Sequence, residues 1–235
     1  MQTDTFQFEP LAEDALLLRI GECIDVAINA RVHAIVDLVQ RQWPQLECVP
    51  AYASVLLRFD ARDWTQDHGN PHQALELALR NALAAGETSY RTPRGQMIPV
   101  CYGGACGPDL TAVAQSLNLP VDEVIARHTA ADYRVAMIGF APGFPYLLGL
   151  DPTLAMPRRH DPRQRVAAGS VGIGGAQTGI YPDQLPGGWQ LIGRTPLRLF
   201  DVRATPPSLL AAGDRVRLRA IDEAEFHHLE AGSRR

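Results

Sequence analysis

Glycine and proline are concentrated in one quarter of this 235-residue chain. The segment 139–196 holds 11 of the 20 glycines and 8 of the 18 prolines within 58 residues. Helices cannot run through such a segment, because proline lacks a backbone N–H and clashes with the preceding turn. Aromatic and β-branched residues are interleaved with the glycines, which argues against low-complexity disorder. The segment is therefore expected to form short strands joined by tight turns, as in a β-barrel.

The flanking sequence supplies further strands and short helices. Apolar runs predict three strands, at 133–140, 197–201 and 215–219, and helical spacing predicts two short helices, at 108–117 and 121–128. The first of these strands is apolar on both faces and is expected to be central, and the other two are expected to close the barrel. Pro120 separates the two helices. A last helix is expected to begin at Asp222, where Glu225 completes a capping box.

The N-terminal part of the chain alternates between strands and helices. Asp25 and Asn70 are expected to cap two helices, the second with Pro71 at its first position. Strands are expected at 16–20, 46–50, 54–59 and 97–102. The resulting order, βαββαβ, is that of a ferredoxin-like split sheet. We therefore expect an α+β chain, with a ferredoxin-like α/β sandwich at 1–95 followed by a β-barrel domain at 96–235.

Composition excludes several kinds of chemistry and several partners. All 22 basic residues are arginines, so the chain has no phosphate-loop, Schiff-base or biotin-carrying lysine. The net charge of −4 argues against nucleic acid or anionic lipid as the main partner. No run approaches 18 apolar residues, so no membrane span is expected. The four scattered cysteines, without zinc spacing, indicate reduced thiols in a cytoplasm and no metal ligands.

An arginine-rich loop at 157–165 is the first candidate site. It holds four arginines and a single acid. Prolines precede Arg158 and Arg163 and stiffen the backbone, and guanidinium groups on a stiff backbone suit bidentate capture of carboxylate or phosphate. A solvated loop is the alternative that the sequence leaves open.

Three further features could carry a site. The turn at 139–147 presents Phe144 and Tyr146 between prolines, either as a structural turn or as the wall of a pocket. The glycine-rich segment 168–179 could cradle an anion with backbone amides, or could allow close approach of strands in a small barrel. It lacks the hydrolase elbow pattern, so Ser170 is not expected to be a nucleophile. His128, expected at the end of a short helix, could reach a cleft or have a structural role.

These segments together resemble the KipI family, also described as allophanate hydrolase subunit 1. The resemblance is carried by GFAPGFPYL at 139–147, AGSVGI at 168–173, QTGIYP at 177–182 and PGGWQLIGRTP at 186–196. Shorter matches precede them, at 102–104, 107–110, 128–129 and 133–135, and the pairs 157–158 and 162–163 lie between them. The resemblance spans nearly the whole chain.

The resemblance implies a cyclophilin-like C-terminal barrel and two partners, a C-type (KipA-like) and an A-type (LamB/YcsF-like) subunit. Together such proteins open the lactam of 5-oxo-L-proline to L-glutamate with ATP, accompanied by Mg²⁺, and related fused domains carboxylate urea. The competing role is inhibition of a sensor histidine kinase, the activity of KipI itself. Peptidyl-prolyl isomerisation is a third possibility, suggested by the barrel alone.

Our hypothesis for the site gathers the arginine loop, the glycine-rich segment and His128 around one cleft, shared with the C-type subunit. Arg158 and Arg163 would hold a carboxylate or phosphate, and His128 would assist proton transfer on the amide. The remaining candidates would bind or enclose the substrate: Phe144, Tyr146, Ser170, Gln177, Thr178, Trp189 and Arg194.

Overall fold

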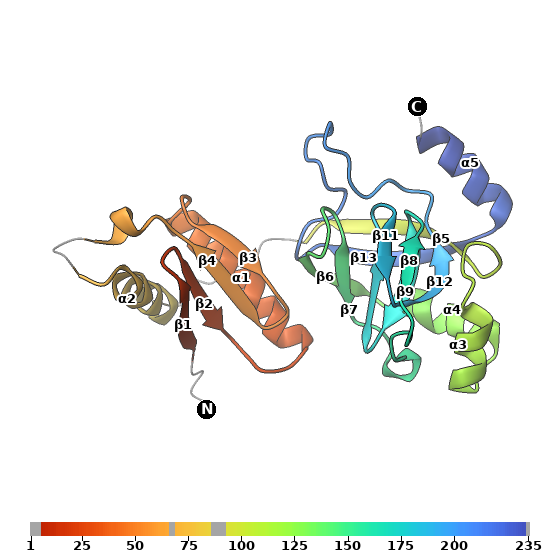
Figure 1. Ribbon diagram of the computed structural model, residues 1–235, viewed down its shortest axis with the longest axis horizontal. Helices are drawn as coiled ribbons and strands as arrows, with labels where there is room; N and C mark the ends of the chain where they lie inside the picture. Colours follow the sequence, from red (N-terminus) through yellow and green to blue (C-terminus); the bar gives the residue numbers. More distant parts are fainter. Residues whose placement is uncertain (1–5, 66–68, 86–92, 234–235) are drawn as a thin grey trace. The chain divides into compact units, whose positions relative to one another are not determined.

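The computed structural model describes residues 6–65, 69–85 and 93–233 (Figure 1). The chain divides into two compact units, Met1–Thr92 and Pro93–Arg235, each with a core of its own. Across the described residues, no helix combines the length and the apolar character that crossing a membrane requires.

The first unit is a four-stranded antiparallel sheet in the order β1-β2-β4-β3, with helices packed on one face. Its elements are β1 (Gln7–Ala12), β2 (Ala15–Arg19), α1 (Val26–Gln42), β3 (Glu47–Pro50), β4 (Ser54–Arg58), the 3₁₀ turn η1 (Ala61–Trp64) and α2 (Pro71–Ala84). Alternate residues of β2 and β4 bury their side chains against the apolar stripes of α1 and α2. This period-two burial places both helices on the same side of the sheet.

Both helix starts predicted from the sequence are confirmed. The Asp25 carboxylate accepts hydrogen bonds from the backbone N–H groups of Ala27 and Ile28, at 2.8 and 2.9 Å. The Asn70 side chain likewise accepts from the second residue of α2, at 2.9 Å, and Pro71 occupies the first turn. Each cap satisfies N–H groups that have no partner within the helix.

The predicted order βαββαβ is wrong in two respects, so the ferredoxin-like split sheet is not confirmed. Strand β1 was missed because five of its six side chains are exposed and give no alternation. The strand expected to complete the sheet, β5 (Gly95–Tyr102), instead pairs with β12 (Gln190–Arg194) and β13 (Arg215–Ile221) of the second unit. Its buried Ile98 and Val100 belong to that unit's core.

The second unit is built on a closed barrel of seven strands in the order β10-β7-β6-β13-β5-β12-β9 (Figure 1). After β5 its elements are α3 (Leu110–Leu117), α4 (Val121–Ala130), β6 (Tyr133–Ile138), β7 (Pro145–Leu148), η3 (Pro152–Leu154), β8 (Arg163–Val166), β9 (Ser170–Gly174), β10 (Gln177–Ile180), β11 (Leu185–Gly187), β12 (Gln190–Arg194), β13 (Arg215–Ile221) and α5 (Glu223–Ser233). Strands β8 and β11 pair separately. The barrel expected from the glycine and proline content is confirmed, and its likeness to cyclophilin stays a prediction.

Glycines in the barrel make room for a large neighbour, as the strand-approach interpretation of segment 168–179 expected. A Cβ at Gly174 would lie 2.7 Å from the Trp189 ring, and one at Gly179 would lie 3.0 Å from it. The indole can therefore lie flat against strands β9 and β10 only because these positions lack a side chain.

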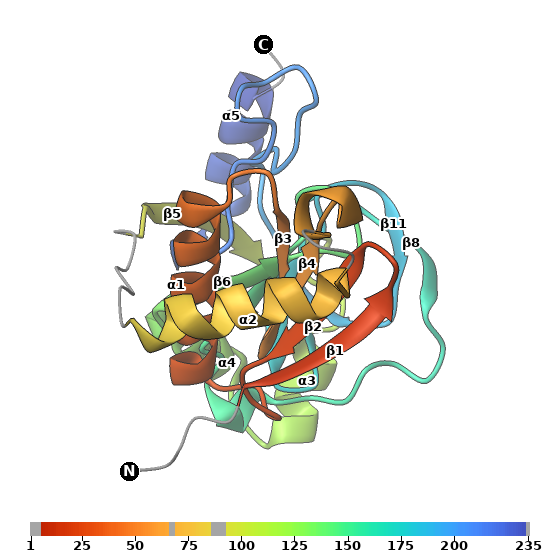
Figure 2. The same cartoon turned by 90° about the vertical axis from the view of Figure 1, so that its left-hand side faces the viewer.

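In Figure 2 the same unit is seen from the side, with α5 extending away from the barrel strands.

Three further predictions for this unit are corrected. The segment 197–201 is no barrel strand; it makes one isolated bridge, between Phe200 and Ser208, and the barrel closes through β13 instead. Helix α4 extends two residues beyond the predicted end, to Ala130, so His128 lies within its last turn and not at its end. At the start of α5 the Asp222 carboxylate accepts from the backbone N–H of Glu225, at 2.7 Å. The Glu225 carboxylate binds Arg219 rather than completing the capping box.

Candidate functional site

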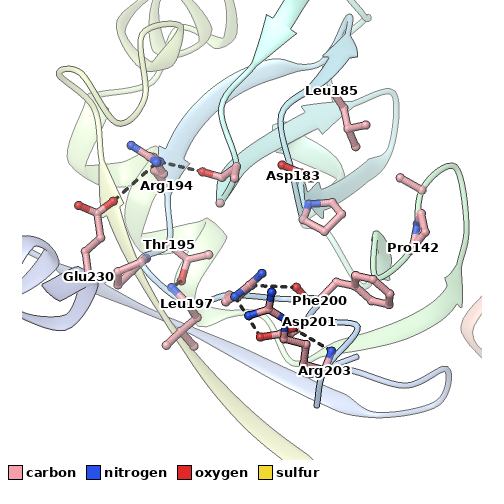
Figure 3. A pocket seen from close by; sticks show the side chains of 16 residues that line it. Pro142, Asp183, Leu185, Arg194, Thr195, Leu197, Phe200, Asp201, Arg203 and Glu230 are labelled. Atoms are coloured by element: carbon pink, nitrogen blue, oxygen red, sulfur yellow. Dashed lines mark hydrogen bonds and ion pairs between the residues drawn. The ribbon is translucent and has the colours of Figure 1, made fainter. Parts of the chain in front are cut away.

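A cavity of about 780 Å³ opens on the second unit, beside the end of β12 (Figure 3). Its walls come from four segments that are distant in sequence and from the last helix, α5. These are 141–142, 168–169, 182–183 with 185, and 194–198 with 200, 201 and 203, together with Glu230. The cavity lies in the size range of small-molecule sites.

The floor of the cavity is held by backbone hydrogen bonds at Gly169. The Gly169 N–H donates to the carbonyl of Tyr181 at 2.7 Å, and its own carbonyl accepts from Thr195 N–H at 2.9 Å. Gly169 has φ +81°, and a Cβ there would lie 2.2 Å from the Thr195 carbonyl oxygen. Only glycine fits this position, which brings three segments of the cavity together.

Arginines line the cavity, and they differ in how fully they are paired. Arg194 donates through Nε to the Ala168 carbonyl at 2.8 Å and lies 3.7 Å from a Glu230 carboxylate oxygen (Figure 3). Arg198 is more firmly bound, through Asp201 at 3.0 Å and the carbonyl of residue 200 at 3.2 Å. Among the described residues, the guanidinium of Arg203 has no ion pair. Three acids, Asp183, Asp201 and Glu230, line the same cavity, so the less fully paired Arg194 and Arg203 are the groups that it offers to an anionic ligand.

Of the site residues predicted from the sequence, only Arg194 lines this cavity. Arg158 is exposed, and its guanidinium lies 5.9 Å from the centre of the Trp189 ring. Arg163 is directed elsewhere, and its Nη2 donates to the Asp109 carboxylate at 2.7 Å. The arginine loop is thus neither a freely solvated loop nor part of the cavity wall.

Asp109 was not among the predicted site residues, although it binds two arginines of the loop. Its side chain is 9% exposed, and one carboxylate oxygen accepts from Arg163 and, at 3.4 Å, from Arg159. The other oxygen accepts from the backbone N–H of Leu191 at 2.7 Å. One buried carboxylate therefore ties the start of α3 to β8 and β12. The only sequence signal for this role is an aspartate that follows Pro108 at the start of a helix. An acid at such a position is usually explained as a helix cap.

Phe144 and Trp189 form a buried aromatic cluster rather than the expected pocket wall. They are 2% and 5% exposed, and their ring centres lie 5.6 Å apart. Tyr146 and Tyr181 pack on Phe144 at 4.9 and 5.2 Å, in tilted and edge-on arrangements that aromatic pairs favour. Ala141 and Leu185, which do line the cavity, pack against this cluster. The aromatic rings support one cavity wall from behind.

His128 is fully buried, which favours the structural role that the sequence left open over access to a cleft. Its Nδ1 lies 2.7 Å from the Tyr102 hydroxyl, and its Nε2 lies 3.0 Å from Oγ1 of Thr178. Burial lowers the pKa of His128 to about 3, because the charged imidazolium cannot be solvated there. The imidazole is therefore neutral and is separate from the cavity, and its catalytic role stays an untested prediction.

The remaining predicted residues belong to the strands behind the cavity. Ser170 begins β9 and is 4% exposed, Thr178 in β10 is fully buried, and Gln177 is half-buried at the start of β10. All four cysteines are free, as their spacing predicted. Within the described part of the chain, no group of three or more His, Cys, Asp or Glu side chains is placed to hold a metal ion.

Residues 6–210 match the sequence family described as the carboxyltransferase domain, subdomains C and D, and the chain belongs to this family. It is 43% identical over 232 residues to the B subunit of 5-oxoprolinase from Bacillus subtilis, covering 96% of this chain and 97% of the relative. It is 56% identical over 212 residues to the B subunit of 5-oxoprolinase from Escherichia coli O157:H7, covering 88% of this chain and 92% of the relative.

A solved structure, that of TTHA0988, shows the same fold. It matches 88% of this chain with 36% identity and a TM-score of 0.76. The chain spans only 40% of the length of TTHA0988, so more than half of that protein lies outside the shared part.

Proposed function

We propose that this chain is the B subunit of an ATP-dependent 5-oxoprolinase, in which the lactam of 5-oxo-L-proline is hydrolysed to L-glutamate. The observation that carries the proposal is the identity of 43% over 97% of a relative that bears this name. The second relative of the same name is 56% identical over 92% of its length. Similarity across whole lengths supports a shared role better than a shared fold does.

In this proposal the chain acts only with a C-type (KipA-like) and an A-type (LamB/YcsF-like) subunit. The names of the relatives, which designate one lettered component of an enzyme, support a multi-subunit assembly. We assign ATP and Mg²⁺ to the assembled complex, as the family resemblance implies, and we place the complex in the cytoplasm. The four free thiols agree with a reducing compartment. We also propose that the closed barrel resembles that of cyclophilin.

The cavity gives this chain a part in binding the substrate. 5-Oxoproline carries a carboxylate beside its lactam, and phosphoryl transfer from ATP brings further negative charge. Arg194 points into the cavity with its side chain 33% exposed, and its contact with Glu230, at 3.7 Å, is long. We assign to Arg194 the carboxylate of the substrate, because a guanidinium in a partly desolvated site binds an anion with two parallel hydrogen bonds.

The proposal is tested by assembling the three subunits and measuring release of glutamate from 5-oxoproline with ATP. Turnover that requires this chain supports its role as the B-type component. An assembled complex that releases no glutamate contradicts it. Urea-like amides, and then inhibition of a sensor kinase, would be the next activities to assay.

A further inference from the structure

Two strongly exposed apolar residues directly adjoin, in the chain, residues that line the cavity. Phe140 is 61% exposed and Val202 is 80% exposed. Their chain neighbours on one side, Ala141 and Asp201, line the cavity. The two loops that carry them touch each other, since a Cβ at Gly143 would lie 2.7 Å from Cβ of Phe200. Exposed apolar groups gathered at the rim of a cavity are typical of interaction sites.

The backbone at Phe140 is strained, although the side chain gains little burial from it. Phe140 has φ +68°, a left-handed conformation that a bulky L-residue rarely adopts. Hydrogen bonds of the turn hold it there, with Gly139 N–H donating to the Phe144 carbonyl at 3.1 Å and Phe144 N–H to the Ala141 carbonyl at 3.0 Å. A glycine would satisfy the same turn without strain. Strained residues of this kind concentrate at binding and catalytic sites.

A cation completes this surface. Arg203 follows Val202 directly and has no ion pair among the described residues, whereas the nearby Arg198 is bound to Asp201 at 3.0 Å. We name Phe140, Val202 and Arg203 the rim patch. An apolar pair beside an unpaired guanidinium is complementary to a protein surface that presents apolar side chains and a carboxylate.

The length of TTHA0988 indicates which protein binds the rim patch. In that protein the part shared with this chain is 40% of one longer polypeptide, so the shared part is covalently joined to further protein. The B subunits from Bacillus subtilis and Escherichia coli match this chain over 97% and 92% of their own length, so beside such a subunit the neighbour would be a separate chain that a surface recognises. We infer that the rim patch is the docking surface for the C-type subunit, which then forms the open side of the cavity. This inference rests on the proposed function for the identity of the partner.

The test uses the complete chain and the purified C-type subunit, with the dissociation constant measured by calorimetry. The double variant F140S/V202S should weaken binding by about 30-fold or more, because a few anchor residues supply most of the binding energy of an interface. R203A should weaken it by about 10-fold and make it less sensitive to salt. The matched control is M97S, which removes a side chain that is 54% exposed in β5, outside the rim patch, and should bind as wild type does.

Wild-type affinity of F140S/V202S, equal weakening by M97S, or no binding by the wild-type chain would each overturn the inference. A second measurement does not depend on the variants folding. Hydrogen exchange at 139–143 and 200–208 should slow when the C-type subunit is added, and unchanged exchange in both loops would also contradict docking there.

Glutamate release by the same preparations separates this inference from the proposed function. In one outcome the double variant fails to bind, and the wild-type complex assembles but releases no glutamate. That result supports docking at the rim patch and rejects the 5-oxoprolinase assignment. In the other outcome F140S/V202S binds as the wild type does, and the complex releases glutamate. That result rejects docking at the rim patch and keeps the assignment.

Discussion

The hydroxyl of Tyr102 lies 2.7 Å from Nδ1 of the fully buried His128. On the far side of the ring, Nε2 lies 3.0 Å from Thr178 Oγ1, and that hydroxyl donates to the carbonyl of Gly172 at 2.9 Å. A hydroxyl has one proton to donate, so Thr178 must accept from Nε2–H. Nδ1 is then unprotonated and accepts from Tyr102. The neutral Nε2–H tautomer satisfies every one of these hydrogen bonds.

This arrangement predicts that the protein loses stability in mild acid. The pKa of His128 is about 3 in the folded chain, against an ordinary value of 6.5 that applies to the unfolded chain. Between these values the unfolded state binds a proton that the folded state does not, so the free energy of unfolding falls as the pH is lowered from 6.5. The slope should approach about 1.4 kcal/mol per pH unit. Urea denaturation between pH 7.5 and 4.5 measures it.

The control for this slope is a histidine that the fold leaves in solvent. The side chain of His160 is 98% exposed, so H160Q should reproduce the wild-type pH dependence. Equal stability of the wild-type protein at pH 7.5 and pH 5 would contradict the buried neutral imidazole.

Two glycines with positive φ should respond differently to alanine. Gly169 and Gly175 have φ +81° and +66°, so both substitutions carry the strain of an L-residue in this region, about 1–2 kcal/mol. A Cβ at Gly169 would also lie 2.2 Å from the Thr195 carbonyl oxygen, while nothing lies within 4 Å of one at Gly175. Thermal denaturation should show G169A several degrees less stable than G175A. Equal melting temperatures would show that the Thr195 carbonyl can move aside at little cost in stability.

The arginine loop should separate into a structural and a solvent-exposed member. R163A removes the 2.7 Å bond to Asp109, whose side chain is 9% exposed, and should cost about 1–3 kcal/mol of stability. R158A removes only an exposed cation–π contact and should change stability by less than about 1 kcal/mol. Chemical denaturation of the two variants measures this difference, and equal losses would contradict it.

The predicted catalytic roles of the same two arginines need assay under conditions where both variants are folded. If Arg158 and Arg163 stabilise charge in the transition state, each alanine variant lowers turnover by the assembled complex about 10²-fold. Near-normal turnover by R158A, in a stable protein, would remove Arg158 from the site.

Binding of the substrate carboxylate is assigned to Arg194, which is the one predicted residue that lines the cavity. R194A in the assembled complex should raise the KM for 5-oxoproline by about 10-fold or more, and R194K should recover part of the loss. R217A is the control, because Arg217 pairs with Asp132 on the surface. An unchanged KM in R194A would show that the carboxylate is bound elsewhere.

Patterns local in sequence predicted the fold well. The caps at Asp25 and Asn70 and the glycine- and proline-rich barrel depend on neighbouring residues, and the structure confirms them. The strand expected at 197–201 did not form, because its apolar residues pack beside the cavity without a barrel partner. Strand β5 was placed in the wrong sheet, because nothing in an isolated strand identifies the strands that pair with it.

The candidate site was predicted less well, because it depends on contacts between distant segments. The sequence showed that Arg163 lies in a stiff loop, but not that Asp109, 54 residues away, binds it. It showed one isolated histidine, but not that Tyr102 and Thr178 enclose His128 from strands β5 and β10. Backbone bonds at Gly169 bring three of the segments that line the cavity together, and no spacing rule reveals such a meeting point.

The role of this chain as a required subunit is tested most directly by assembling the complex with and without it. A-type, C-type and B-type subunits would be co-expressed and purified, and glutamate release from 5-oxoproline would be followed with and without ATP. We expect ATP-dependent release that disappears when this chain is omitted and returns when purified chain is added. Equal release without this chain would contradict its role as a required subunit.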